Sequence, residues 1–155
     1  MNLNSFSLKE TLRIGKKIAE FARKGDVFCL SGELGAGKTL LAKGIAWGLG
    51  INKDAVISPT FVILRQYSGR LPLYHFDLYR LNNPGEILDL GYEEFFFGDG
   101  LTIVEWPDRL KWLLPEDCLN IRLSIRGENK RAFSIQAKGK RSKLLLRSLH
   151  ENLGN

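Results

Sequence analysis

The sequence of 155 residues lacks the features that mark several large classes of protein. Its two cysteines, Cys29 and Cys118, lie in separate apolar runs, so we expect buried free thiols and neither a disulfide nor a cysteine metal cluster. No run of about 18 apolar residues occurs, and no apolar block follows a basic N-terminal end, so neither membrane spanning nor secretion is expected. Low-complexity segments and internal repeats are absent as well. The composition therefore predicts one globular domain over residues 1–155 that works in the cytoplasm, away from membranes.

Acidic residues are scarce near the C-terminal end. The net charge is +6, and between Arg122 and Arg147 nine Lys and Arg residues accompany the single acid Glu128. Such a basic surface can approach nucleic acid or an acidic partner, and it can equally be a solvated face that favours solubility. Both interpretations stay open for the basic hairpin and helix expected at about residues 118–150.

Apolar residues recur with two periods, which predicts that strands alternate with helices along the chain. Ser7 and Glu10 have the spacing of a capping box, and the pattern that follows predicts a helix that ends near Gly25. A buried strand is predicted over residues 26–32 and a helix from about Lys38 to Trp47. Other predicted elements are a β-hairpin over 61–67 and 71–79, a short helix over 83–91 with Asn83 as cap and Pro84 at its first position, a helical turn over 92–100, a strand over 101–105, a helix over 108–114, a second hairpin over 118–125 and 132–138, and a basic amphipathic helix over 141–154.

A glycine-rich loop lies between the first predicted strand and the helix after it. Gly32, Gly37, Lys38 and Thr39 match the P-loop pattern G-x-x-x-x-G-K-[ST] in the strand-to-helix context that the pattern requires. Backbone N–H groups of such a loop surround phosphates, Lys38 can reach the β- and γ-phosphates, and the Thr39 hydroxyl can bind Mg²⁺. The alternative is a turn that is glycine-rich by chance. The pattern predicts a P-loop NTPase-like three-layer α/β fold with a mixed parallel and antiparallel central sheet, and a phosphate cradle made of Glu33, Leu34, Gly35, Ala36, Gly37, Lys38, Thr39 and Leu40.

Two acids follow apolar runs at the positions where a P-loop protein needs them. Asp77 comes after one predicted strand and Glu105 after another. Because Mg²⁺ takes oxygen ligands and open α/β sheets build their sites at strand ends, both acids are candidates for the metal and for the attacking water. Each could instead be a cap or a surface acid. Thr60, in the segment before the next strand, is either a switch threonine that senses the γ-phosphate or part of a strand-entry turn.

The base-reading motif of GTPases is missing from the later part of the chain. The nearest candidate, "NKDA" from Asn52 to Ala55, comes too early and has alanine where the aspartate belongs. ATP is therefore the expected nucleotide. A small-molecule kinase stays an alternative, although we find no separate lid segment between the predicted strands.

Several linked motifs, taken together, resemble one known family. "GELGAGKT", "SPTF", "HFDLYRL", "DLGYEE" and "VEWPDR" occur in the order and approximate spacing of the TsaE (YjeE) family, over roughly residues 5–126. The resemblance implies a P-loop ATPase needed for threonylcarbamoylation of adenosine 37 in tRNA. It also implies that the ATPase is not the transferase, acts with a TsaB–TsaD pair, and meets tRNA only through that complex.

The resemblance further implies roles for individual residues. Lys38, Glu105 and Asp77 would be catalytic, with ATP and Mg²⁺ as cofactors. Leu40 departs from the family pattern, which often has a second threonine there. The full set implied is Gly32, Gly35, Gly37, Lys38 and Thr39 for the phosphates, Thr60 as the switch threonine, Thr39, Asp77 and Glu105 for Mg²⁺ and water, and Trp106 as a neighbouring aromatic residue.

Smaller candidates each have a structural alternative, and for His75 structure or positioning is favoured over chemistry. His75 shares a strand face with Asp77, so it either orients a group of the site or fills the core. Arg80 either stabilises charge during phosphoryl transfer or pairs with an acid such as Glu86. Phe95, Phe96 and Phe97 cannot all face one core from a short helix, so either one of them is exposed and suits a protein partner, or the turn is buried on two sides.

Overall fold

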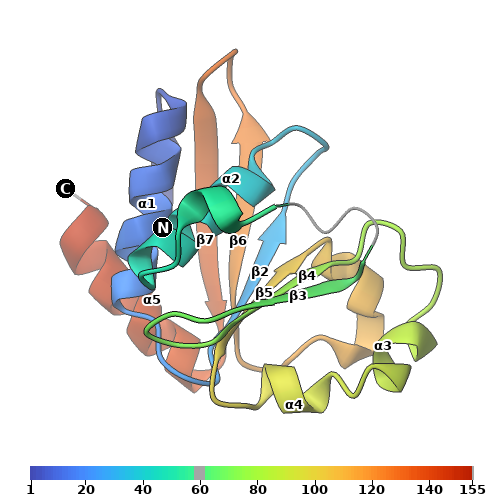
Figure 1. The fold of residues 1–155 in the computed structure, drawn as a ribbon. Helices are drawn as coiled ribbons and strands as arrows, with labels where there is room; N and C mark the ends of the chain where they lie inside the picture. The colour runs from blue at the N-terminus through green and yellow to red at the C-terminus, as the bar shows by residue number, and fades with distance from the viewer. Residues whose placement is uncertain (58–61, 155) are drawn as a thin grey trace.

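The chain folds around one seven-stranded sheet in a computed structural model that describes residues 1–57 and 62–154. The strand order across the sheet is β1-β7-β6-β2-β5-β4-β3 (Figure 1). The strands are β1 (Asn2–Ser5), β2 (Val27–Ser31), β3 (Leu64–Tyr67), β4 (Leu73–Asp77), β5 (Leu101–Glu105), β6 (Cys118–Ile125) and β7 (Arg131–Lys138).

The sheet is mixed, as the sequence predicts. Strands β6, β2, β5 and β4 form a parallel centre. The hairpin partners β3 and β7 run antiparallel to β4 and β6, so both predicted hairpins are confirmed. Strand β1 was not expected, because its four residues carry only one large apolar side chain, Leu3, and its partner β7 lies at the other end of the chain. It covers the edge of β7, which would otherwise present unpaired backbone groups.

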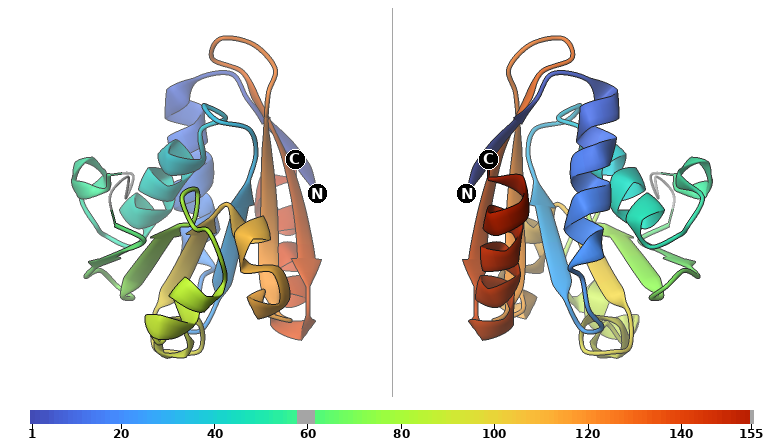
Figure 2. Two further views of the ribbon diagram at one scale, coloured as in Figure 1. Left: turned by 90° about the vertical axis from the view of Figure 1, so that its right-hand side faces the viewer. Right: turned by 90° about the vertical axis from the view of Figure 1, so that its left-hand side faces the viewer.

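Helices cover both faces of the sheet, which makes the three predicted layers (Figure 2). In β2, Phe28 and Leu30 belong to one core with residues of α1, α2 and α5, whereas Val27 and Cys29 belong to a second core with residues of α3, α4 and the 3₁₀ segment η2. This alternation follows from the period of two along a strand. The helical elements are α1 (Leu8–Glu20), α2 (Lys38–Gly48), η1 (Lys53–Ala55), α3 (Gly85–Asp89), α4 (Glu93–Phe96), η2 (Pro107–Leu113) and α5 (Lys140–Leu153).

Some predicted helix bounds and types are wrong. Helix α1 has its cap at Ser7, as expected, but it ends at Glu20 and not near Gly25. Residues 23–26 instead form a turn, in which the Asp26 carboxylate accepts a hydrogen bond from the Arg23 N–H. Pro84 is the cap of α3 and not its first residue. The helix predicted over 108–114 is the 3₁₀ segment η2, broken at Lys111, where φ is 50° and ψ is −116°.

The structure confirms the buried free thiols and decides between the two alternatives for the phenylalanine run. Cys29 and Cys118 are buried and free. Of the three adjacent phenylalanines, Phe96 is fully buried and Phe97 is 68% exposed. No helix in the described ranges combines the length and the apolarity needed to cross a bilayer.

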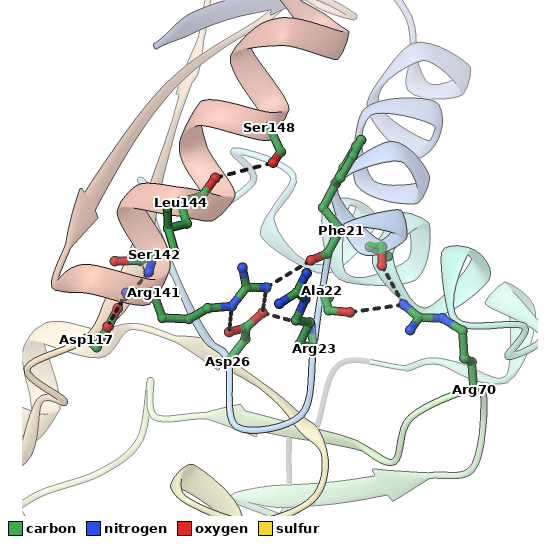
Figure 3. A network of polar contacts seen from close by, with 11 residues as sticks. Phe21, Ala22, Arg23, Asp26, Arg70, Asp117, Arg141, Ser142, Leu144 and Ser148 are labelled. Atoms are coloured by element: carbon green, nitrogen blue, oxygen red, sulfur yellow. Dashed lines mark hydrogen bonds and ion pairs between the residues drawn. The ribbon is translucent and has the colours of Figure 1, made fainter.

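A network of polar contacts lies at the sheet edge where the parallel strands begin, and it includes the Arg141–Asp26 ion pair (Figure 3). Arg141, at the start of α5, donates to both carboxylate oxygens of Asp26, at 3.0 and 2.8 Å, and to the Phe21 carbonyl at 3.0 Å. Asp117 accepts from the backbone N–H groups of Arg141 and Ser142 and so caps α5 from a neighbouring loop. These contacts connect the start of α5 and the end of α1 to the segments that precede β2 and β6.

Candidate active site

The opposite edge, where the parallel strands end, carries a cavity of about 380 Å³. The predicted phosphate loop connects β2 to α2 along one side of it. Asp77 at the end of β4 and Glu105 at the end of β5 lie on the other side. This is the edge at which open α/β sheets bind ligands. The lining residues are Leu34, Gly35, Gly37, Lys38, Thr39, Leu40, Asp77, Tyr79, Arg80, Glu105 and Trp106.

The loop conformation depends on two of its glycines. Gly32 has a φ of 146°, and a Cβ there would lie 2.5 Å from the Leu123 carbonyl oxygen of β6. Gly37, the residue before α2, has a left-handed φ of 103°. Side chains at these positions would strain the backbone, because L-residues seldom adopt such angles. The loop can therefore turn tightly into α2, whose first N–H groups are available to an anion.

Lys38 is held inside the loop by backbone carbonyls. Its Nζ donates to the Gly32 and Glu33 carbonyl oxygens at 2.7 and 3.0 Å, and the residue is 5% exposed. Burial lowers the pKa of the Lys38 ammonium, while the carboxylates of Glu105, Asp77 and Glu33 oppose that shift. The Nζ also lies 4.3 Å from the ring centroid of Trp106, a cation–π distance. A cation is thus fixed at the position where the loop would receive phosphates.

Glu105 is a buried acid, so the alternative interpretation of this residue as a surface acid is wrong. It is 2% exposed, and its Oε1 accepts from the Thr39 hydroxyl at 3.1 Å and lies 2.8 Å from His75 Nε2. In the sheet register Glu105 lies opposite Asp77. Asp77 is half-buried, and its Oδ1 accepts from the Tyr79 N–H at 3.0 Å, so it also caps the turn after β4. Three candidate metal ligands therefore line the same cavity.

The donor set suits a magnesium ion that arrives with a nucleotide. Thr39, Asp77 and Glu105 offer oxygen atoms only, which are the ligands that Mg²⁺ prefers. In the described part of the chain no three His, Cys, Asp or Glu side chains converge to form a cage made of protein alone. Mg²⁺ in phosphate-binding sites commonly needs only one or two carboxylates, because phosphates and water complete its shell. Thr60, the candidate switch threonine, lies outside the described residues.

Arg131, at the start of β7, supports the loop and was missed by the sequence analysis. Its Nε donates to the Ala36 carbonyl at 2.9 Å and one terminal nitrogen to the Gly35 carbonyl at 3.4 Å. The other terminal nitrogen binds three carbonyls of the β6–β7 turn, those of Gly127, Glu128 and Lys130. Only its place in the basic C-terminal stretch is visible in the sequence, because the contact crosses 95 positions.

The remaining candidates divide between the cavity and other places. Arg80 lines the cavity, and His75 lies beneath it against Glu105. Trp106 has a left-handed backbone, with φ of 60° and ψ of 52°, and its ring packs 5.0 Å from that of Tyr79. Asn52 of the "NKDA" segment caps η1 by accepting from the Asp54 N–H. That contact gives this asparagine a local structural role.

Comparison with known proteins identifies the family. The family model described as "Threonylcarbamoyl adenosine biosynthesis protein TsaE" matches residues 5–133. The chain belongs to the TsaE family. Two TsaE relatives named "tRNA threonylcarbamoyladenosine biosynthesis protein TsaE" come from Bacillus subtilis and Treponema pallidum. The first is 44% identical over 150 residues, which cover 95% of this chain and 93% of the relative. The second is 38% identical over 135 residues, which cover 87% and 99%.

A solved structure agrees with this TsaE assignment. The crystal structure of Bacillus subtilis YdiB matches with a TM-score of 0.82 and 38% sequence identity, over 98% of this chain and 96% of that one. The likeness extends over both hairpins and the C-terminal helix, which lie partly or wholly beyond the motifs that suggested the family.

Proposed function

We propose that this chain binds ATP with Mg²⁺ at the P-loop cavity and hydrolyses the nucleotide in support of threonylcarbamoyladenosine formation in tRNA. The observation that carries the proposal is the convergence of Lys38, Thr39, Asp77 and Glu105 on one cavity at the end of the parallel strands. The names of its TsaE relatives supply the process. The proposed location of this reaction is the cytoplasm, as the sequence leads us to expect.

The residues of the cavity divide the chemistry between them. Loop N–H groups and Lys38 would bind the phosphate oxygens and stabilise charge that develops on them. Mg²⁺, held by Thr39, Asp77 and Glu105, would neutralise the phosphates when bound. Glu105 would also orient the attacking water, and Lys38 would leave the Gly32 and Glu33 carbonyls for the nucleotide. We expect slow turnover by the chain alone, because no separate lid segment was found in the sequence.

The proposed partners are a TsaB–TsaD pair, through which tRNA would be reached. These two proteins would carry out the transfer of the threonylcarbamoyl group, and this chain would supply the ATP-dependent step. A small-molecule kinase and a nucleotide-gated scaffold are the rival functions, and both use the same cavity. They differ from the proposal in the fate of the γ-phosphate.

Phosphate release from ATP and Mg²⁺ tests the proposal. The purified chain is assayed alone and with a TsaB–TsaD pair and tRNA, with Lys38→Ala as the inactive control. We expect slow release alone and faster release with the pair. Tight ATP binding without release under either condition would support the scaffold, and labelled phosphate appearing on a metabolite would support the kinase.

A further inference from the structure

His75 is a polar residue completely enclosed by the protein beside the proposed catalytic acid. It is 0% exposed, and its Nε2 lies 2.8 Å from Glu105 Oε1, whose residue is itself 2% exposed. A buried polar side chain is costly unless it is hydrogen-bonded, so this placement needs a compensating contact. Glu105 is the partner that supplies it.

The sheet register explains how the two side chains meet. Strands β4 and β5 are parallel, with His75 opposite Ile103 and Asp77 opposite Glu105. Alternate residues share a face, so His75 stands on the same face as Glu105, two register positions before it along the strands. Leu73 and Ile103 place that face against the α2 side of the sheet, where Thr39 is the second residue of the helix. His75 therefore reaches Glu105 from below the cavity.

The hydrogen bonds also indicate which imidazole nitrogen carries a proton. Glu105 Oε1 already accepts from the Thr39 hydroxyl at 3.1 Å, so an acceptor faces His75 Nε2. His75 Nδ1 is buried, and it has no hydrogen-bond partner among the residues that the structure describes. A proton placed only on Nδ1 would leave a buried donor without an acceptor there and set two lone pairs against each other. Nε2 is therefore the donor.

We propose that His75 is a positioning residue for Glu105, whose Oε1 it holds through an Nε2–H hydrogen bond. Together with Thr39 it fixes the carboxylate, so that Oε2, 3.5 Å from the Thr39 hydroxyl, is presented to the metal and water side of the cavity. Groups that hold a metal ligand from behind commonly change metal affinity or activity by about 10–100-fold when removed. The proposal rests on the proposed function, since it says what Glu105 is held for.

The protonated nitrogen can be read directly in the nucleotide-free wild-type protein. The chain has two histidines, and His150 is exposed on α5, so a ¹⁵N-histidine spectrum with His150→Gln as the assignment variant isolates His75. We expect Nε2 of His75 to carry a proton in long-range ¹H–¹⁵N correlations. A proton on Nδ1 alone would overturn the proposal, whether or not the protein hydrolyses ATP.

Two variants separate positioning from packing. His75→Leu removes the donor, and His75→Gln keeps an N–H donor on a side chain of similar reach. Phe76→Leu is the matched control, because Phe76 is the next residue of β4, equally buried, and faces the other core. For each variant, ATP affinity is measured in EDTA and during a Mg²⁺ titration, and melting temperature and kcat are recorded alongside.

We expect His75→Leu to raise the Mg²⁺ concentration for half-maximal ATP binding about tenfold and to leave the affinity in EDTA within about twofold. His75→Gln should recover most of the Mg²⁺ response, and Phe76→Leu should lower the melting temperature without changing that response. If His75→Leu and Phe76→Leu behave alike, His75 is only structural and the inference is wrong. Failure of the wild-type protein to bind ATP would instead reject the proposed function, and the spectrum would still decide which nitrogen His75 uses.

Discussion

The two edges of the parallel sheet carry cavities of similar size, about 380 Å³ at the strand ends and about 410 Å³ at the strand starts. Each cavity has a nearly buried acid in its wall, Glu105 at one edge and Asp26 at the other. Cavity volume and a buried carboxylate therefore do not distinguish a candidate catalytic edge from a structural one.

The partners of the two acids do distinguish the edges. Asp26 is paired with the Arg141 guanidinium at 2.8 and 3.0 Å and also accepts from the Arg23 N–H (Figure 3). Glu105 has hydrogen-bond contacts with a hydroxyl and an imidazole, those of Thr39 and His75. A carboxylate that already holds a guanidinium has its charge compensated within the protein, whereas one held by a hydroxyl and an imidazole can still accept a metal ion. The chemistry of the partners, more than the shape of the cavity, indicates function.

The largest effect should come from the cation of the P-loop edge. Lys38→Ala removes the ammonium that the Gly32 and Glu33 carbonyls hold in place, so we expect ATP affinity to fall at least about 100-fold. Lys24→Ala, which changes an exposed cation at the other cavity, is the matched control and should bind ATP normally. Calorimetric titration with ATP and Mg²⁺ measures both. Equal losses in the two variants would remove the distinction between the edges.

Replacement of Glu105, the acid at the P-loop edge, should affect turnover more than nucleotide binding. Glu105→Gln keeps the size of the side chain and removes its charge, so we expect kcat to fall about 100-fold while ATP affinity in EDTA stays within about threefold. Phosphate release and equilibrium binding give the two numbers. In the complex with a TsaB–TsaD pair, full multiple-turnover modification by this variant would favour a scaffold that does not need hydrolysis.

Replacement of Asp26, the acid at the other edge, should lower the stability of the protein and leave its turnover unchanged. Asp26→Ala removes the carboxylate to which Arg141 and the Arg23 N–H donate and leaves Arg141 only the Phe21 carbonyl, so we expect the free energy of unfolding to fall by about 2 kcal/mol. The loss is smaller than for a fully buried pair because the Arg141 side chain is 30% exposed. Urea denaturation measures this free energy. The control is Glu20→Ala, which breaks the exposed Lys17–Glu20 pair and should change the free energy of unfolding by less than about 0.5 kcal/mol. A change in kcat of the folded protein would contradict the assignment of this edge.

The smallest effect concerns the support of the P-loop from β7. Arg131→Met removes the donors to Gly35 and Ala36 but keeps an unbranched side chain, so we expect ATP affinity to fall about tenfold, or about 1.4 kcal/mol. Arg122→Met, on the exposed side of β6, is the control and should not change ATP affinity. Titration with a fluorescent nucleotide measures the affinity of both variants and resolves a tenfold difference. If both variants bind ATP like the wild type, Arg131 supports only the hairpin turn.

The sequence predicts the P-loop edge better than the edge at Asp26, because the residues of a P-loop pattern lie close together in the chain. Gly32, Gly37, Lys38 and Thr39 are close in the chain, and strand patterns bring Asp77 and Glu105 to the same edge. The layers and both hairpins follow from apolar periodicity in the same way. The proposed roles of these residues stay predictions until they are measured.

What the sequence did not predict depends on contacts between distant segments. Strand β1 is defined by its pairing with β7, and Arg131 reaches the P-loop across 95 positions. The Asp26–Arg141 pair spans 115 positions, so neither residue carries a local signal of it. The helix predicted over 108–114 became 3₁₀ because the backbone turns left-handed at Trp106 and breaks at Lys111. Each of these features is settled by tertiary packing and not by local pattern.

Hydrogen exchange with and without ATP and Mg²⁺ tests most directly whether nucleotide binds at the P-loop edge. If the nucleotide binds at the P-loop edge, we expect added protection in residues 32–40 and near Asp77, Glu105 and Trp106, and none around Asp26, Cys118 or Arg141 at the other cavity. Protection that appeared at the Asp26 edge, or at neither edge with ATP at saturating concentration, would contradict it.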